Sequence, residues 1–216
     1  MKFVKKMIKQ KLKIQRVLLT TVVAFGLASC VSLNSHQTGR TVGKDDYAAF
    51  ANVNLGIDPD PIHQVEVGAF HGIKENLDLG VKINSFFHLT GLSKLQIIGN
   101  KNSLFASSIG MNIGITPYGL PVGLIGYSST LSLFNSIHPT DYLAFTFSPT
   151  YHYFGYADYS KIKTYNTVSN IYGYSVGVIV GKKHQVSLEL LQFENNVVYL
   201  LYSEPIISLG YILNFE

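Results

Sequence analysis

The sequence predicts an all-β protein, an antiparallel up-and-down transmembrane β-barrel of eight to ten strands. Three observations predict it. Along most of the chain apolar residues alternate with small or polar ones, the period of two that is typical of β-strands. Only 14% of the residues are charged. The less apolar strand faces carry mainly Gly, Ser and Asn, which fits a crowded barrel lumen better than a surface in water.

Residues 1–29 are predicted to be a targeting segment. A lysine-rich start precedes an apolar run over 17–28, which is too short to cross a bilayer as a helix. The run ends in Leu27-Ala28-Ser29-Cys30, which resembles the lipobox of bacterial lipoproteins. The resemblance implies cleavage before Cys30 and a lipid on Cys30, the only cysteine of the chain. A short membrane anchor, or a cleaved signal with a chance cysteine, is the alternative.

Loss of this segment would reverse the sign of the net charge. Seven of the 17 Lys and Arg lie within residues 1–29, whereas all 13 Asp and Glu follow them. The mature chain would therefore carry a net charge of −3 instead of the +4 of the whole sequence. A basic surface for nucleic acid is not expected on such a chain.

Residues 30–40 are polar and predict a tether, and residues 41–216 predict one barrel domain. Turn residues divide this domain into alternating runs; Asp58-Pro59-Asp60-Pro61, for example, cannot continue a strand ladder. The longest later connections, 155–168 and 194–204, are expected at one end of the barrel. The predicted strands are 45–57, 62–72, 77–88, 92–99, 103–116, 121–135, 140–154, 169–181, 184–193 and 205–215.

The apolar faces of these strands are predicted to point outward, toward lipid. The alternation is clearest at 77–84, where Leu79 and Val81 oppose Gly80 and Lys82. In hydrocarbon every backbone polar group needs a partner within the protein, and a closed barrel has no unpaired edge. The alternative is a lipid-anchored periplasmic barrel of the lipocalin type, whose apolar faces would point inward around an apolar ligand.

The last strand, 205–215, carries a second resemblance. Ser208, Gly210, Leu213 and Phe215 are similar to the C-terminal strand of bacterial outer-membrane β-barrels, although Glu216 follows the aromatic residue. The resemblance implies that these four residues are recognised by the barrel-assembly machinery. Together with the lipobox it implies export through the lipoprotein pathway, contact with outer-membrane lipid, and both chain ends in the periplasm.

A polar network is predicted inside the lumen. Glu66 and Lys82 lie on adjacent strands of one hairpin, on the inward face, and fall roughly level across the turn at 74–76. A buried charge is costly without a partner, so these two predict an ion pair. Lys94, Gln96 and Glu189 are expected to join this interior. Its role is either structural filling or an ion pathway.

No catalytic residue, metal site or cofactor is predicted. The seven histidines show none of the close spacings of metal ligands. Ser148 and His152 share a strand face, but four residues of strand separate them by about 13 Å, too far for a nucleophile and its base. The His-x-Ser spacing of lipid A deacylases, which are small outer-membrane barrels, is absent.

The predicted function is therefore an outer-membrane β-barrel lipoprotein with a structural or surface-interaction role and a largely filled lumen. Its Tyr-rich segment 155–168 is a candidate partner-binding loop. A narrow channel for small solutes, a membrane-embedded enzyme and the lipocalin-like barrel are the alternatives. Conductance measurements separate the first of these from a filled barrel.

Overall fold

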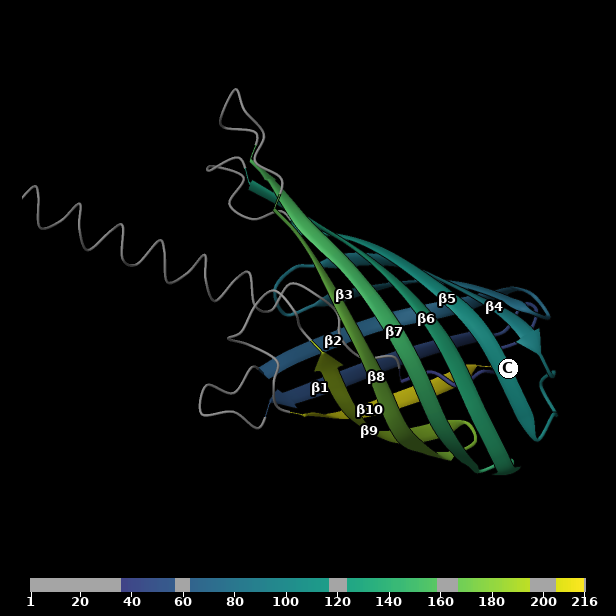
Figure 1. Ribbon diagram of the computed structural model, residues 1–216. Helices are drawn as coiled ribbons and strands as arrows, with labels where there is room; N and C mark the ends of the chain where they lie inside the picture. Colours follow the sequence, from purple (N-terminus) through teal and green to yellow (C-terminus); the bar gives the residue numbers. More distant parts are fainter. Residues whose placement is uncertain (1–35, 57–62, 117–123, 159–166, 195–204, 216) are drawn as a thin grey trace, which may run out of the picture.

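The computed structural model describes residues 36–56, 63–116, 124–158, 167–194 and 205–215, which form ten antiparallel strands closed into a barrel (Figure 1). Each strand pairs with its neighbours in sequence, and β1 pairs with β10 to close the ring. The barrel fold and the strand number are thus confirmed. The strands are β1 (Tyr47–Gly56), β2 (His63–Lys74), β3 (Leu77–Asn84), β4 (Leu89–Ile98), β5 (Phe105–Thr116), β6 (Leu124–Thr140), β7 (Leu143–Asp158), β8 (Thr167–Gly181), β9 (His184–Glu194) and β10 (Ile206–Phe215).

No helix within the described residues is long and apolar enough to cross a membrane.

The two ends of the barrel differ. At one end, here the turn end, residues 75–76, 141–142 and 182–183 make two-residue connections, residues 99–104 make a longer one, and β1 begins and β10 ends there. At the other, here the loop end, the connections cover 57–62, 85–88, 117–123, 159–166 and 195–205. The longest connections, 117–123, 159–166 and 195–205, all lie at the loop end, and outer-membrane barrels likewise carry their longer connections on one side.

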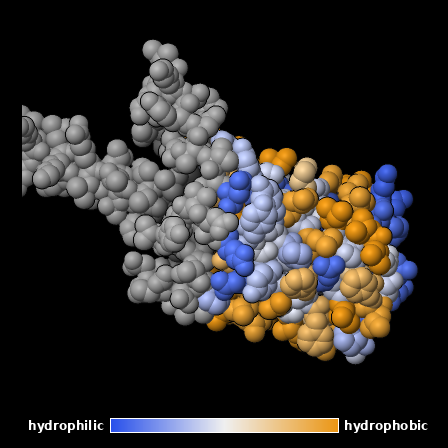
Figure 2. All heavy atoms as spheres, in the orientation of Figure 1, coloured by the Kyte–Doolittle hydropathy of each residue, from blue (hydrophilic) through white to orange (hydrophobic). Residues whose placement is uncertain are grey.

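The outer surface of the barrel is apolar and its interior is largely polar. Val81 is 59% exposed and Ile113 is 58% exposed, and Figure 2 shows apolar residues over much of the visible face of the wall. Glu66, Asp78 and Ser108, in contrast, are fully buried in the lumen. A lipocalin-like barrel needs the opposite arrangement, so that alternative is wrong.

Two apolar clusters interrupt the polar interior. One lies toward the loop end and comprises Ile171, Leu191, Phe193 and Ile206. The other lies toward the turn end and comprises Ala48, Ala144, Ile179 and Ile212. Ile212 interrupts the small and polar residues Ser208, Gly210 and Asn214 on the inward face of the last strand, and the second cluster accounts for it. The lumen is therefore filled by side chains at the loop end.

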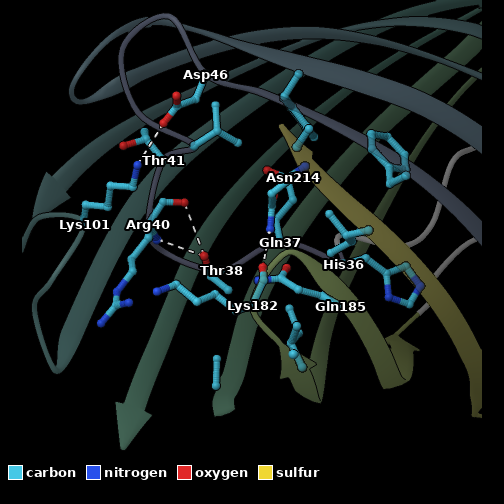
Figure 3. A pocket seen from close by; sticks show the side chains of 18 of the residues that line it. His36, Gln37, Thr38, Arg40, Thr41, Asp46, Lys101, Lys182, Gln185 and Asn214 are labelled. Carbon is cyan, nitrogen blue, oxygen red and sulfur yellow. Dashed lines mark hydrogen bonds and ion pairs between the residues drawn. The ribbon is translucent and has the colours of Figure 1, made fainter. Parts of the chain in front are cut away.

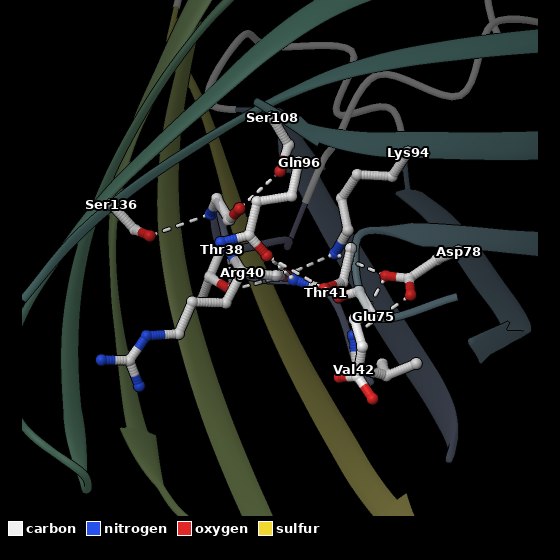
Figure 4. Close-up of polar contacts among 11 residues, drawn as sticks. Thr38, Arg40, Thr41, Val42, Glu75, Asp78, Lys94, Gln96, Ser108 and Ser136 are labelled. Atoms are coloured by element: carbon white, nitrogen blue, oxygen red, sulfur yellow. Dashed lines mark hydrogen bonds and ion pairs between the residues drawn. The ribbon is translucent and has the colours of Figure 1, made fainter. Parts of the chain in front are cut away.

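Residues 36–46, here the internal segment, occupy much of the turn-end half of the lumen. The sequence predicts a tether over 30–40, yet the described part of it, from His36 onward, lies inside the barrel. Its polar composition suits this place because the lumen wall offers hydrogen-bond partners along its length (Figure 4). The alternation of apolar and polar residues that identifies the strands is absent from this segment, so that pattern could not predict its place in the lumen.

Small residues in the wall make room for the internal segment. Gly72 exchanges backbone hydrogen bonds with the segment, donating to the carbonyl of Asp46 (2.9 Å) and accepting from the amide of Asp45 (2.8 Å). A Cβ at Gly72 would lie 1.6 Å from the carbonyl oxygen of Gly43. Gly39 is equally confined, because its Cβ would lie 2.2 Å from the carbonyl oxygen of Ala106.

Gly72→Ala is expected to destabilise the folded barrel by about 1–3 kcal/mol, because backbone must move to accept the methyl group. Urea unfolding followed by circular dichroism measures the loss. Gly91→Ala is the matched control, since its Cβ would meet only the Ile113 carbonyl oxygen at an ordinary 3.8 Å. Equal stability of the two variants would contradict the placement of the internal segment against Gly72.

Candidate functional site: the lumen and its internal segment

The middle of the internal segment is bound through its backbone. The amide of Gly39 donates to Ser136 Oγ on β6 (2.9 Å), and the carbonyl of Gly39 accepts from Ser108 Oγ on β5. Both serines are buried, with hydroxyls that face the segment (Figure 4). Small hydroxyl side chains at these positions leave space for a chain in the lumen and satisfy its backbone at the same time.

A charged contact fixes the segment nearer the turn end. Lys94 Nζ donates to the carbonyl of Arg40 (2.8 Å) and lies 3.2 Å from Asp78 Oδ2. The Asp78 carboxylate in turn accepts from the amide of Val42 at 3.1 Å. Gln96 Oε1 accepts from both the amide and the hydroxyl of Thr41, at 3.0 and 2.9 Å. The pair Asp78–Lys94 therefore holds the segment as well as neutralising itself.

His36 begins the described part of the internal segment and faces the lumen side of the last two strands, β9 and β10. Its Nε2 lies 2.5 Å from Ser208 Oγ and its Nδ1 lies 2.6 Å from Ser187 Oγ. Ser208 donates its hydroxyl hydrogen to Asn54 Oδ1, 2.5 Å away, so Ser208 accepts from Nε2–H. Nδ1 then accepts from Ser187, which assigns a neutral imidazole with the proton on Nε2.

The five predicted lumen residues are all buried. Lys82 Nζ lies 3.4 Å from Glu66 Oε2, which is the pair that the hairpin predicts. Lys94 pairs with Asp78, Gln96 binds the internal segment, and Glu189 Oε2 lies 4.0 Å from His36 Nδ1. Asp78 is the functional residue missed by sequence reasoning, although it stands directly opposite Lys94 in the β3–β4 ladder.

The other predicted residues fall on both sides of the wall. Ser208 and Gly210 face the lumen, where a Cβ on Gly210 would lie 2.7 Å from His36 Nδ1. Phe215 is 45% exposed on the outer side, and Leu213 is half-buried. Cys30 and the lipobox lie outside the described residues.

The described residues hold no cluster of three or more His, Cys, Asp or Glu that could bind a metal. Ser148 and His152 are both fully buried on β7, but neither is the partner of the other. His152 Nδ1 lies 2.9 Å from Thr130 Oγ1, and Ser148 Oγ has no hydrogen-bond partner among the described residues. Ser148 and His152 therefore do not form the hydrogen-bonded pair that a nucleophile and its base require.

The His36 contacts predict a pH dependence of stability. Burial lowers the pKa of His36, Glu189 and Glu66 raise it, and Lys82 lowers it further; the net direction is downward. A histidine whose pKa is lower in the folded state contributes stability above its unfolded pKa of about 6.5 and loses it as the pH falls. We expect the barrel to lose stability below about pH 6.5, and less so in His36→Gln.

Urea unfolding at a series of pH values measures this difference. The matched control is His184→Gln, which removes an exposed imidazole at the turn end. If His36→Gln retains the full pH dependence of the natural barrel, the buried neutral imidazole is not its source.

No protein-family model and no curated protein matches the chain. Solved barrels similar to it include the N-terminal β-barrel domain of Pseudomonas aeruginosa OprF, at 11% identity and a TM-score of 0.31, covering 80% of this chain and 99% of that one. Neisserial surface protein A is 8% identical, with a TM-score of 0.38 and coverages of 79% and 96%. Ail, the attachment invasion locus protein of Yersinia pestis, is 4% identical, with a TM-score of 0.31 and coverages of 79% and 95%. Identities and TM-scores this low carry no information on the activity of this chain. Its fold is established by its own strand pairing.

Proposed function

We propose that the chain is an outer-membrane β-barrel lipoprotein with a structural or surface-interaction role. The observation that carries the proposal is the inverted arrangement of the barrel, with exposed Val, Ile, Leu and Phe outside and buried ion pairs inside. A wall of this kind is stable where hydrocarbon surrounds it, because its backbone is fully paired and its outer side chains are apolar.

A filled lumen favours a structural or binding role over a channel. The internal segment occupies much of the turn-end half, and the loop-end half holds an apolar cluster together with His88, which hydrogen-bonds to both Thr116 and Ser128. The buried residues of this interior perform no identified chemistry, so we also propose that the protein is not an enzyme.

Insertion into a bilayer is tested by a charge on the outer wall. Val81→Arg, in the middle of β3, is expected to lower the free energy of unfolding in lipid vesicles by about 2–4 kcal/mol. Asn76→Arg, in the exposed β2–β3 turn, is the matched control and is expected to leave it unchanged. Folded and boiled samples on a gel report the folded fraction. If Val81→Arg leaves the barrel soluble and folded without lipid or detergent, the membrane proposal fails.

The lipid on Cys30 and the periplasmic position of both chain ends complete the proposal. Five residues, 31–35, separate Cys30 from His36, and the six steps from one Cα to the next span at most about 20 Å when extended. Metabolic labelling with a fatty acid tests the anchor: Cys30→Ser is expected to abolish the label and to retain the folded barrel. A tag placed after Glu216 is expected to be accessible only in permeabilised cells.

A further inference from the structure

We infer that the barrel binds a small organic anion with an apolar body in a cavity at its turn end. The cavity holds about 290 Å³ and lies between the internal segment and the wall (Figure 3). This is about ten times the volume of a water molecule in the liquid. The lining combines an apolar wall with two cations that form no ion pair among the described residues, and each feature constrains the ligand.

The apolar wall comes from the turn-end cluster. Ala48, Ala144, Ile179 and Ile212 line the cavity, and Phe50 joins them from β1. Water in a cavity needs two to four polar partners, which such a wall does not supply. An apolar group of a ligand would gain free energy by displacing water from this side.

The polar side of the cavity carries surplus positive charge. Of its four Lys and Arg residues, Lys94 is paired with Asp78 and Lys101 with Asp46, at 3.2 and 2.8 Å. The remaining two, Arg40 and Lys182, make no ion pair among the described residues. Asp141 is the one other carboxylate of the lining, so the cavity has a net positive charge.

Arg40 also has donor capacity to spare. One terminal nitrogen donates to the carbonyl of Ser103 (2.5 Å), whereas Nε is buried without a hydrogen-bond partner in the described part of the chain. Arg40 belongs to the internal segment, and Lys182 reaches the cavity from the β8–β9 turn (Figure 3). A carboxylate or phosphate monoester between them would receive charge-assisted hydrogen bonds from both.

Binding is tested with the purified folded barrel in a neutral detergent, and the probe is 4-(trifluoromethyl)benzoate observed by fluorine NMR. Its ring and single carboxylate match the cavity in size and polarity. We expect saturable binding, and weaker binding of the neutral 4-(trifluoromethyl)benzyl alcohol by about tenfold. Arg40→Gln combined with Lys182→Gln is expected to weaken benzoate binding by at least about tenfold.

The matched control is Lys183→Gln, which removes an exposed cation beside Lys182 that does not line the cavity. It is expected to bind the benzoate as tightly as the natural barrel. Ile179→Ala is a second variant, which keeps the wall uncharged and is expected to weaken binding through the lost apolar contact while the barrel still migrates as a folded species. Equal binding of acid and alcohol, or an equal loss in Lys183→Gln, would overturn the inference. The inference stands apart from the membrane proposal, because a barrel that never enters a bilayer can still be tested for it.

Discussion

Removal of residues 36–44 is expected to admit water to the turn-end half of the lumen without making the barrel conduct ions. In the intact barrel Ser108 is fully buried and donates to Gly39 of the internal segment. Without that segment the same wall position faces an open vestibule. The loop-end half remains closed, because the apolar cluster of Ile171, Leu191, Phe193 and Ile206 and the bonds of His88 to Thr116 and Ser128 do not involve the segment.

Thiol labelling measures this effect. In a barrel with Cys30→Ser, Ser108→Cys is expected to resist a charged thiol reagent, and deletion of residues 36–44 is expected to make it react readily. Ser128→Cys, buried toward the loop end, is the control and stays protected in both barrels. Planar-bilayer recordings of the deleted barrel are expected to remain silent. Discrete ion currents would show that the side chains do not seal the loop end, and they would revive the channel alternative.

Lys82→Met is expected to destabilise the barrel by about 3–5 kcal/mol, the usual cost of leaving a buried charge without its partner. Glu66 is 0% exposed, and its second carboxylate oxygen already lacks a hydrogen-bond partner among the described residues. Loss of the ammonium would leave the carboxylate with no compensating charge within an ion-pair distance. Circular dichroism during urea unfolding measures the change.

Two further variants define the cause of that loss. Lys82→Met with Glu66→Gln is expected to recover most of the stability, because no unpaired charge remains. Lys101→Met is the matched control: Lys101 is 52% exposed beside Asp46, and such a surface pair contributes less than about 1 kcal/mol. If the double variant is as unstable as the single one, the lost stability comes from packing around the lysine stem.

The sequence could predict the wall of the barrel because alternation repeats along it. Within each strand the alternation alone indicates which residues face outward. Ten strands and their outward faces can therefore be predicted without knowing which strands pair with each other. Glu66 and Lys82 could be paired for a similar reason, since one short hairpin brings them together. The partner of Lys94 cannot be predicted from that hairpin, because Lys94 lies on the next strand, β4. Asp78 is recognised as this partner only from the register of β3 against β4.

The contents of the lumen could not be predicted in the same way. The internal segment has no periodic pattern, and its partners come from β2 through β10, far apart in sequence. Ile212 breaks the alternation of the last strand, but its explanation needs Ala48, Ala144 and Ile179 from three other strands. The cavity at the turn end arises between these groups, so no single stretch of sequence encodes it.

The depth of His36 has a consequence for the order of folding. His36 bonds to Ser208 and Ser187, which follow it by 172 and 151 residues, so this contact must wait for the C-terminal strands. A finished barrel surrounds the segment with a closed wall, so the segment could enter it only by threading lengthwise into the lumen. An open sheet that wraps around the segment and then joins β1 to β10 avoids this obstacle. Closure of the ring and capture of the segment are then a single late event, with the slow kinetics expected of contacts this distant in sequence.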